Sequence, residues 1–122
     1  MANPKDITRW KRGRDHWNEW AEGLLTAKEK LEKEGTWKVD NDGRRGNAET
    51  GSWLDTALVN FSEYDFEEEA DFRGFVFPDT ARFVGTEFKE NALFNMAAFS
   101  GRALFEKATF SGDARFTYRR ER

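Results

Sequence analysis

The sequence predicts a mainly β fold, a solenoid of short strands wound as a β-helix, with an α-helical cap on its N-terminal side. Between residues 61 and 116, Phe recurs with gaps of five and six residues in strict alternation. Small residues, mostly Ala, precede Phe by two positions and Gly often follows it by two. Self-similarity this regular indicates a repeat architecture. Two Phe series result, each with a period of 11: Phe61, Phe72, Phe83, Phe94, Phe105 and Phe116, and Phe66, Phe77, Phe88, Phe99 and Phe110.

A period of 11 residues also suits a right-handed helical supercoil. However, residues two apart lie about 200° apart on an α-helix, so Ala and Phe cannot share one stripe. In a strand they share a face. Phe, Thr and Gly are also poor helix formers. Each unit is therefore predicted to be a short strand with two inward side chains, followed by a corner.

The segments ADFRG (70–74), ARFVG (81–85), AAFSG (97–101) and ATFSG (108–112) resemble the pentapeptide repeat, in which a small residue, a polar residue, Leu or Phe, a polar residue and Gly follow one another. The resemblance covers about residues 59–118. It implies a right-handed quadrilateral β-helix with four five-residue sides per coil, the central Phe and the preceding small residue pointing inward.

One departure from this pattern changes the size of a coil. An extra residue follows every second pentapeptide, and we expect these residues at corners: Glu69, Thr80, Asn91, Arg102 and Asp113. A coil should then take 22 residues rather than 20. Phe83, for example, is predicted to lie between Phe61 and Phe105.

The N-terminal segment carries the signals of an amphipathic helix. Asn3 and Pro4 suit its start, and Gly35 suits its end. Gly13 and Gly23 leave a division into two helices open, and residues 38–52 are predicted to form a loop. One apolar stripe follows the helix, made of Ile7, Trp10, Trp17, Ala21, Leu24 and Leu31.

So short a solenoid needs covers for its two ends. The inward slot before Phe holds the bulky residues Val59, Tyr64 and Phe75 early in the repeats. These would fill the mouth of the first coil, and we expect the Trp-striped helix to pack there rather than to form a coiled-coil seam with a partner. At the other end the tail TYRRER follows Phe116. Three alternatives stay open: the tail caps this end, two chains stack end to end, or the chain is a fragment.

We therefore divide the chain into a helical cap and loop (1–54), the β-helix (55–118) and a basic tail (119–122). All five Trp precede residue 54, and all twelve Phe lie between 61 and 116. The helical segment is nearly neutral, whereas residues 55–116 hold 12 acidic and 6 basic side chains.

Composition argues against most chemistry. The 122-residue chain has no Cys, one His and a formal net charge of -3. The absence of Cys excludes disulfides and thiolate sites. His16 is the only histidine, and we expect it to be solvated or to dock the helix, so a catalytic triad would lack its base. The carboxylates of residues 63–72 are interpreted as a solvated face. We expect no enzyme activity, cofactor or metal site, and, without an apolar signal or membrane-spanning run, a cytoplasmic protein.

The prediction for function is a non-catalytic scaffold or protein–protein interaction module. A protein partner or self-association is expected, with no small-molecule substrate, nucleic acid or membrane. Leu93 and Leu104 occupy outward slots where relatives of this kind prefer Asp or Asn. The candidate interaction surface therefore comprises Leu93, Leu104, Trp10, Trp17 and Trp20.

Two alternatives remain. Some pentapeptide-repeat proteins mimic DNA through an acidic surface and occupy DNA gyrase, and the net charge of residues 55–116 favours such a regulator of a topoisomerase. Unlike side chains at positions 22 apart argue against such a mimic, as with the acidic Asp71, the apolar Leu93 and the basic Arg115. The second alternative is that the chain is the N-terminal part of a longer multidomain effector.

Overall fold

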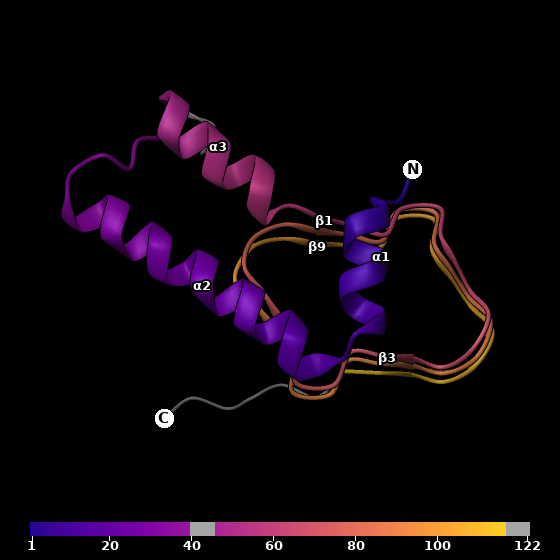
Figure 1. Ribbon diagram of the computed structural model, residues 1–122. Helices are drawn as coiled ribbons and strands as arrows, with labels where there is room; N and C mark the ends of the chain where they lie inside the picture. Colours follow the sequence, from indigo (N-terminus) through magenta and orange to yellow (C-terminus); the bar gives the residue numbers. More distant parts are fainter. Residues whose placement is uncertain (40–45, 117–122) are drawn as a thin grey trace.

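The computed structural model describes residues 1–39 and 46–116, in which three helices precede eleven two-residue strands (Figure 1). The helices are α1 (Pro4–Lys11), α2 (Arg14–Lys33) and α3 (Ala48–Ala57). The strands are β1 (Val59–Asn60), β2 (Asp65–Phe66), β3 (Ala70–Asp71), β4 (Val76–Phe77), β5 (Ala81–Arg82), β6 (Glu87–Phe88), β7 (Ala92–Leu93), β8 (Ala98–Phe99), β9 (Ala103–Leu104), β10 (Thr109–Phe110) and β11 (Ala114–Arg115). The predicted tail, 119–122, lies outside the described residues.

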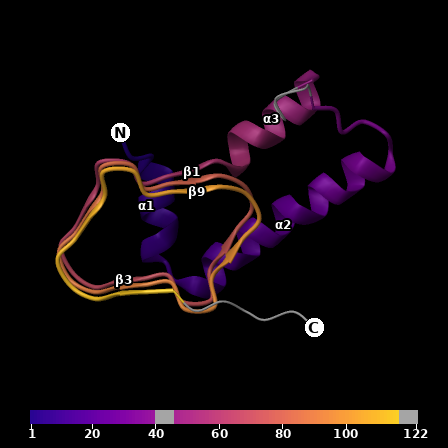
Figure 2. The same cartoon turned by 180° about the vertical axis from the view of Figure 1, so that it is seen from behind.

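The strands form four parallel stacks, in the orders β1–β5–β9, β2–β6–β10, β3–β7–β11 and β4–β8. Paired residues are 22 apart: Val59 pairs with Ala81, and Ala81 with Ala103. The coils therefore overlie one another when viewed along the stack (Figures 1 and 2). The predicted coil of 22 residues is confirmed.

The two Phe series fill the interior as columns of parallel rings. Phe61, Phe83 and Phe105 stack in one column, with ring centroids 5.4 and 5.0 Å apart. Rings of neighbouring columns meet edge to face, as between Phe83 and Phe94. Phe83 is fully buried. Burial of an aromatic side chain and ring contacts of this kind both stabilise a core.

Glycine at the corners has two different physical reasons. In the first Phe series the residue two after Phe has φ between 60° and 72°, a conformation that favours glycine. This set comprises Glu63, Gly74, Gly85, Met96 and Lys107. In the second series the problem is space, because a Cβ on Gly101 would lie 2.7 Å from the backbone carbonyl carbon of Asp79.

The predicted N-terminal helix is divided at Gly13. Asn3 caps α1 by accepting a hydrogen bond from the backbone N–H of Lys5, with Pro4 at the first turn. Gly13 has a φ of 101°, which turns the chain between α1 and α2. Gly35, with a φ of 75°, follows the end of α2 as predicted.

The prediction of a loop over residues 38–52 is wrong at its C-terminal side, because α3 begins at Ala48. Asn47 caps α3 by accepting from the N–H of Thr50. Trp53 anchors the helix: its indole N–H donates to the carbonyl of Leu24 on α2 at 2.7 Å. The helices α2 and α3 run side by side away from the coils (Figures 1 and 2). The predicted boundary between residues 54 and 55 falls inside α3.

Candidate functional site

The N-terminal end of the stack is covered by α1 and the start of α2 (Figure 2). The Trp10 ring stacks on Phe72 with centroids 5.6 Å apart and meets Phe66 edge-on. Trp17 is fully buried and packs on the rings of Phe61 and Phe75. The first part of the apolar stripe, Ile7, Trp10, Trp17 and Ala21, therefore packs in one core with the chain's own coils.

Side chains of the helical segment also bond the free backbone edge of the first coil. The indole N–H of Trp10 donates to the carbonyl of Asp71, and that of Trp17 to the carbonyl of Val76 at 2.8 Å. Asn18 accepts from the N–H of Val76 at 2.8 Å and donates to the carbonyl of Gly74 at 2.9 Å. Asn18 thus bonds the edge of β4 as a neighbouring strand would. An edge satisfied in this way is closed to further strands.

Asp6 completes this cover at β1. Its carboxylate, only 2% exposed, accepts from the N–H of Asn60 at 2.9 Å and pairs with Arg9 at 2.8 Å. Burial raises the pKa of Asp6 above its usual value, although the Asn60 N–H and the Arg9 guanidinium act in the opposite direction. Arg9 in turn lies 3.8 Å from the ring centroid of the half-buried Trp20.

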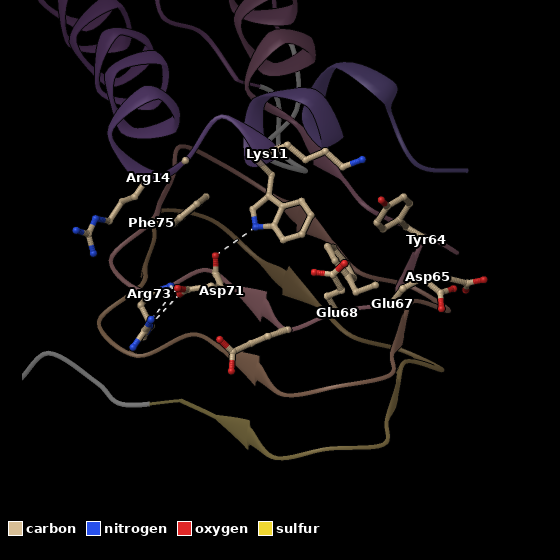
Figure 3. Close-up of a pocket in the computed structure, with 13 residues that line it drawn as sticks. Lys11, Arg14, Tyr64, Asp65, Glu67, Glu68, Asp71, Arg73 and Phe75 are labelled. Carbon is tan, nitrogen blue, oxygen red and sulfur yellow. Dashed lines mark hydrogen bonds and ion pairs between the residues drawn. The ribbon is translucent and has the colours of Figure 1, made fainter.

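A groove of about 760 Å³ lies between the turn from α1 to α2 and the first coil (Figure 3). Lys11 and Arg14 line it from the helical side, and Glu67 and Glu68 from the coil. Asp71 and Arg73 also line the groove, but they are paired with each other at 2.7 Å.

Within this groove the hydrogen bond from Arg73 lowers the pKa of the Asp71 carboxyl. No set of three His, Cys, Asp or Glu side chains among the described residues has the geometry to hold a metal ion. The groove is lined by both acidic and basic side chains, and its closest ion pair, Asp71 with Arg73, is formed between lining residues. The lining therefore does not favour one class of ligand.

The C-terminal end of the stack contrasts with the capped end. Phe110 and Phe116 are 37% and 48% exposed, whereas Phe88 and Phe94, one coil earlier, are 1% and 2% exposed. The strands β8, β9, β10 and β11 each lie at the outer edge of their stack. Apolar rings and strand edges are thus both accessible at this end in the part of the chain that the structure describes.

The residues of the predicted interaction surface lie in different places. Trp10 and Trp17 hold the helical cap to the coil, and Trp20 lies beside Arg9. Leu93 is only 8% exposed, between its register partners Asp71 and Arg115, so the chain itself buries it. These residues do not form one surface, and burial makes Leu93 and Trp17 unsuitable for binding a partner. Leu104 lies half-buried on β9, at the open end.

Sequence reasoning missed the polar part of the cap. Asp6 and Asn18 gave no signal, because each is one polar residue on a helix rich in them. His16 is exposed beside Arg12, its Nε2 lying 3.5 Å from the arginine Nη1. No helix in residues 1–39 or 46–116 is both long and apolar enough to span a bilayer.

A comparison with known families identifies the repeats. Residues 72–118 match the family model described as pentapeptide repeats (9 copies). This segment of the chain is therefore similar to pentapeptide repeats. Neither the curated proteins nor the solved structures yield a match to the chain. The match confirms the resemblance found in the sequence, and pentapeptide-repeat proteins are generally non-catalytic structural or interaction modules.

Proposed function

We propose that this chain is a non-catalytic scaffold that binds another protein at the C-terminal end of its coils, and that the coils form a right-handed quadrilateral β-helix. The single observation that supports the binding end is the exposure of Phe110 and Phe116, which contrasts with the buried rings one coil earlier. Exposed strand edges accompany these rings. Proteins use such edges to add strands from a partner.

The outer faces offer less for recognition. Outward residues of successive coils mix acidic, apolar and basic types, as where Asp71, Leu93 and Arg115 are aligned in one stack. The salt bridge between Lys89 and Glu67 joins two coils of another stack at 2.9 Å. Exposed pairs of this kind contribute little to stability or recognition. The open end is therefore the favoured binding surface.

Paired substitutions test the proposal in a capture experiment with the full chain as bait. Phe110→Glu with Phe116→Glu places charge at the open end and is expected to abolish capture of the partner. The matched control, Arg82→Glu with Glu87→Arg, changes outward residues of the middle coil without altering net charge, and should capture as the wild type does. Equal capture by both variants would overturn the proposal, as would a wild type that binds neither another protein nor a second copy of this chain.

The alternative, a DNA mimic that regulates DNA gyrase, is favoured by the excess of acidic side chains, 12 against 6, over residues 55–116. Mixed charge along the stacks argues against an imitation of the phosphate backbone. A gyrase supercoiling assay separates the two. Inhibition by the wild type that survives the Phe110→Glu and Phe116→Glu changes would favour the mimic.

A further inference from the structure

We infer that the partner at the open end is a second copy of this chain, joined end to end across a twofold axis, with β9 facing the partner's β10 and β11 facing the partner's β8. This inference rests on the proposed function and specifies its partner. The direction of the backbone hydrogen bonds at the open end supports this arrangement.

Two of the four stacks point their strand-flanking N–H groups toward the open end. In the stack of β5 and β9, the N–H groups of Ala81 and Phe83 donate to the carbonyls of Arg102 and Leu104, one coil later. The stack of β7 and β11 follows the same rule, because Ala92 donates to Asp113. By the 22-residue repeat, the outermost N–H groups of these two stacks lie at four residues of the last coil, which are Ala103, Phe105, Ala114 and Phe116.

The other two stacks have the opposite direction. In the stack of β6 and β10, the N–H groups of Thr109 and Ser111 donate backward to the carbonyls of Thr86 and Phe88. In the stack of β4 and β8, Ala98 donates backward to Phe75. In these two stacks the carbonyls of Ala108, Phe110, Ala97 and Phe99 therefore point toward the open end.

This polarity selects one arrangement of two chains. The β9 edge carries more N–H donors than carbonyl acceptors, so a face-to-face dimer that brings β9 against the partner's β9 leaves buried N–H groups without acceptors. Rotation about a diagonal of the end face instead sets β9 against the partner's β10, with antiparallel strands. The N–H of Ala103 then meets the carbonyl of the partner's Phe110, and the N–H of Phe105 meets that of the partner's Ala108.

The same rotation satisfies the remaining two edges. It places the N–H of Ala114 at the carbonyl of the partner's Phe99. The coil climbs through β8, β9, β10 and β11 in order, so among the strands of the described residues β8 has the lowest outermost edge and β11 the highest. Pairing the lowest with the highest, and the middle two with each other, keeps the spacing between the chains uniform.

Side chains agree with this register. Each inward Phe at the open end faces an inward Ala, as Phe110 faces the partner's Ala103 and Phe105 faces the partner's Ala108. Large against small is the arrangement that lets facing layers interdigitate. At the corner on the twofold axis, the exposed Glu106 meets the partner's Lys107, and the reciprocal pair repeats the contact.

Two other occupants are less well supported. A second copy stacked head to tail would need a free N-terminal end, and there Trp10, Trp17 and Asn18 already bond the edge. The other occupant would be a further coil of the same chain. Such a coil needs a small residue and Phe at its inward positions, but Arg119 and Glu121 stand 22 positions after Ala97 and Phe99.

Cysteine cross-linking tests the register, because the chain has no Cys of its own. Leu104 and the partner's Thr109 would form a pair without mutual hydrogen bonds, with Cα atoms about 4.5 Å apart, within disulfide range. The variant with Leu104→Cys and Thr109→Cys should form covalent dimers under mild oxidation. Leu104→Cys with Arg115→Cys is the mismatched control and should stay monomeric on a denaturing gel.

A charge exchange tests the contact at the axis by light scattering with size-exclusion chromatography. The wild type is expected to be a dimer. Lys107→Glu sets Glu against Glu twice and should raise the dimer Kd on the order of tenfold. Adding Glu106→Lys restores opposite charges and should restore the dimer.

A monomeric wild type at all concentrations, or cross-linking of the mismatched control alone, would overturn the inference. If the chain is monomeric and the open-end variant still loses capture of a different protein, the inference fails while the proposed function stands. If no protein is captured and no dimer forms, both fail.

Discussion

At the scale of single residues, Asn18 substitutes for a missing strand. Its carboxamide both donates and accepts, so one side chain satisfies the carbonyl of Gly74 and the N–H of Val76 at the edge of β4. A carboxylate can only accept. The identity of the group therefore matters here more than its size.

Asn18→Asp is accordingly expected to lower the free energy of unfolding by about 1–3 kcal/mol, because the carbonyl of Gly74 loses its donor and faces a charged oxygen. Urea unfolding followed by Trp fluorescence measures this in the cap, where all five Trp lie. Glu19→Gln, at the exposed neighbouring residue, is the control and should change stability by less than about 0.5 kcal/mol. Equal stabilities of the two variants would contradict this role of Asn18.

Asp6 and Asp71 should give pH dependences of opposite sign. Burial raises the pKa of Asp6 in the folded state, so the folded chain binds this proton more tightly than the unfolded chain. The resulting stability is fully present below the unfolded pKa and is lost as the pH rises through the folded pKa. Arg73 lowers the pKa of Asp71, whose contribution is present above the unfolded pKa and is lost as the pH falls through the folded pKa.

Urea unfolding of Asp6→Asn and Asp71→Asn, compared with the wild type over a series of pH values, checks these signs. As the pH falls from neutral toward the unfolded pKa of 3.8, the wild type should gain stability relative to Asp6→Asn. Relative to Asp71→Asn it should lose stability on further acidification. A change of stability of the same sign relative to both variants would contradict the opposite pKa shifts of the two carboxyls.

At the scale of elements, the turn between α1 and α2 depends on Gly13. Its φ of 101° is unfavourable for any side chain, although nothing lies within 4 Å of a Cβ built there. Gly23 also has open space, but it lies inside α2. The two glycines therefore separate backbone conformation from helix propensity.

Gly13→Ala is expected to lower the melting temperature, at a cost of about 1 kcal/mol or more, because Ala resists the positive φ. Gly23→Ala should raise it, with a gain of about 0.5–1 kcal/mol from helix propensity. Thermal unfolding by circular dichroism compares both variants with the wild type. Stabilisation by both changes would mean that the turn at Gly13 is not needed.

The elements also show what the sequence predicts well. The strands follow from the spacing of Phe. The small residue two positions before each Phe fixes the strand face, and two periods of 11 residues give the coil length. The helix α3 was missed, because Asn, Gly and Asp dominate residues 38–52 and its apolar anchor, Trp53, lies beyond them. Asn47 as a capping residue, with Glu49 in the first turn, was the available start signal.

At the scale of the whole molecule, the two ends of the coils differ in ways only partly readable from sequence. The bulky Phe75 predicted the covered end, and it does contact Trp17. The bonds made by Asp6 and Asn18 were not predictable, because they depend on where a helix crosses a strand edge in space. The direction of the outermost backbone groups also needs coordinates, since a repeat pattern fixes side-chain facing but not which edge ends in donors.

This asymmetry predicts a gradient of hydrogen exchange along the coils. In a repeat stack each coil is stabilised by its neighbours, so amides of residues 59–80, beneath the cap, should exchange more slowly than those of 103–116. In dilute solution we expect the last coil to exchange on the order of tenfold faster or more. Mass spectrometry of peptides from both segments measures the difference. Raising the protein concentration should slow exchange in 103–116 but not in 59–80, because dimerisation covers the open end, and Lys107→Glu should reduce this effect. Equal exchange of both segments in dilute solution would show that the open end is not the weak end of the stack.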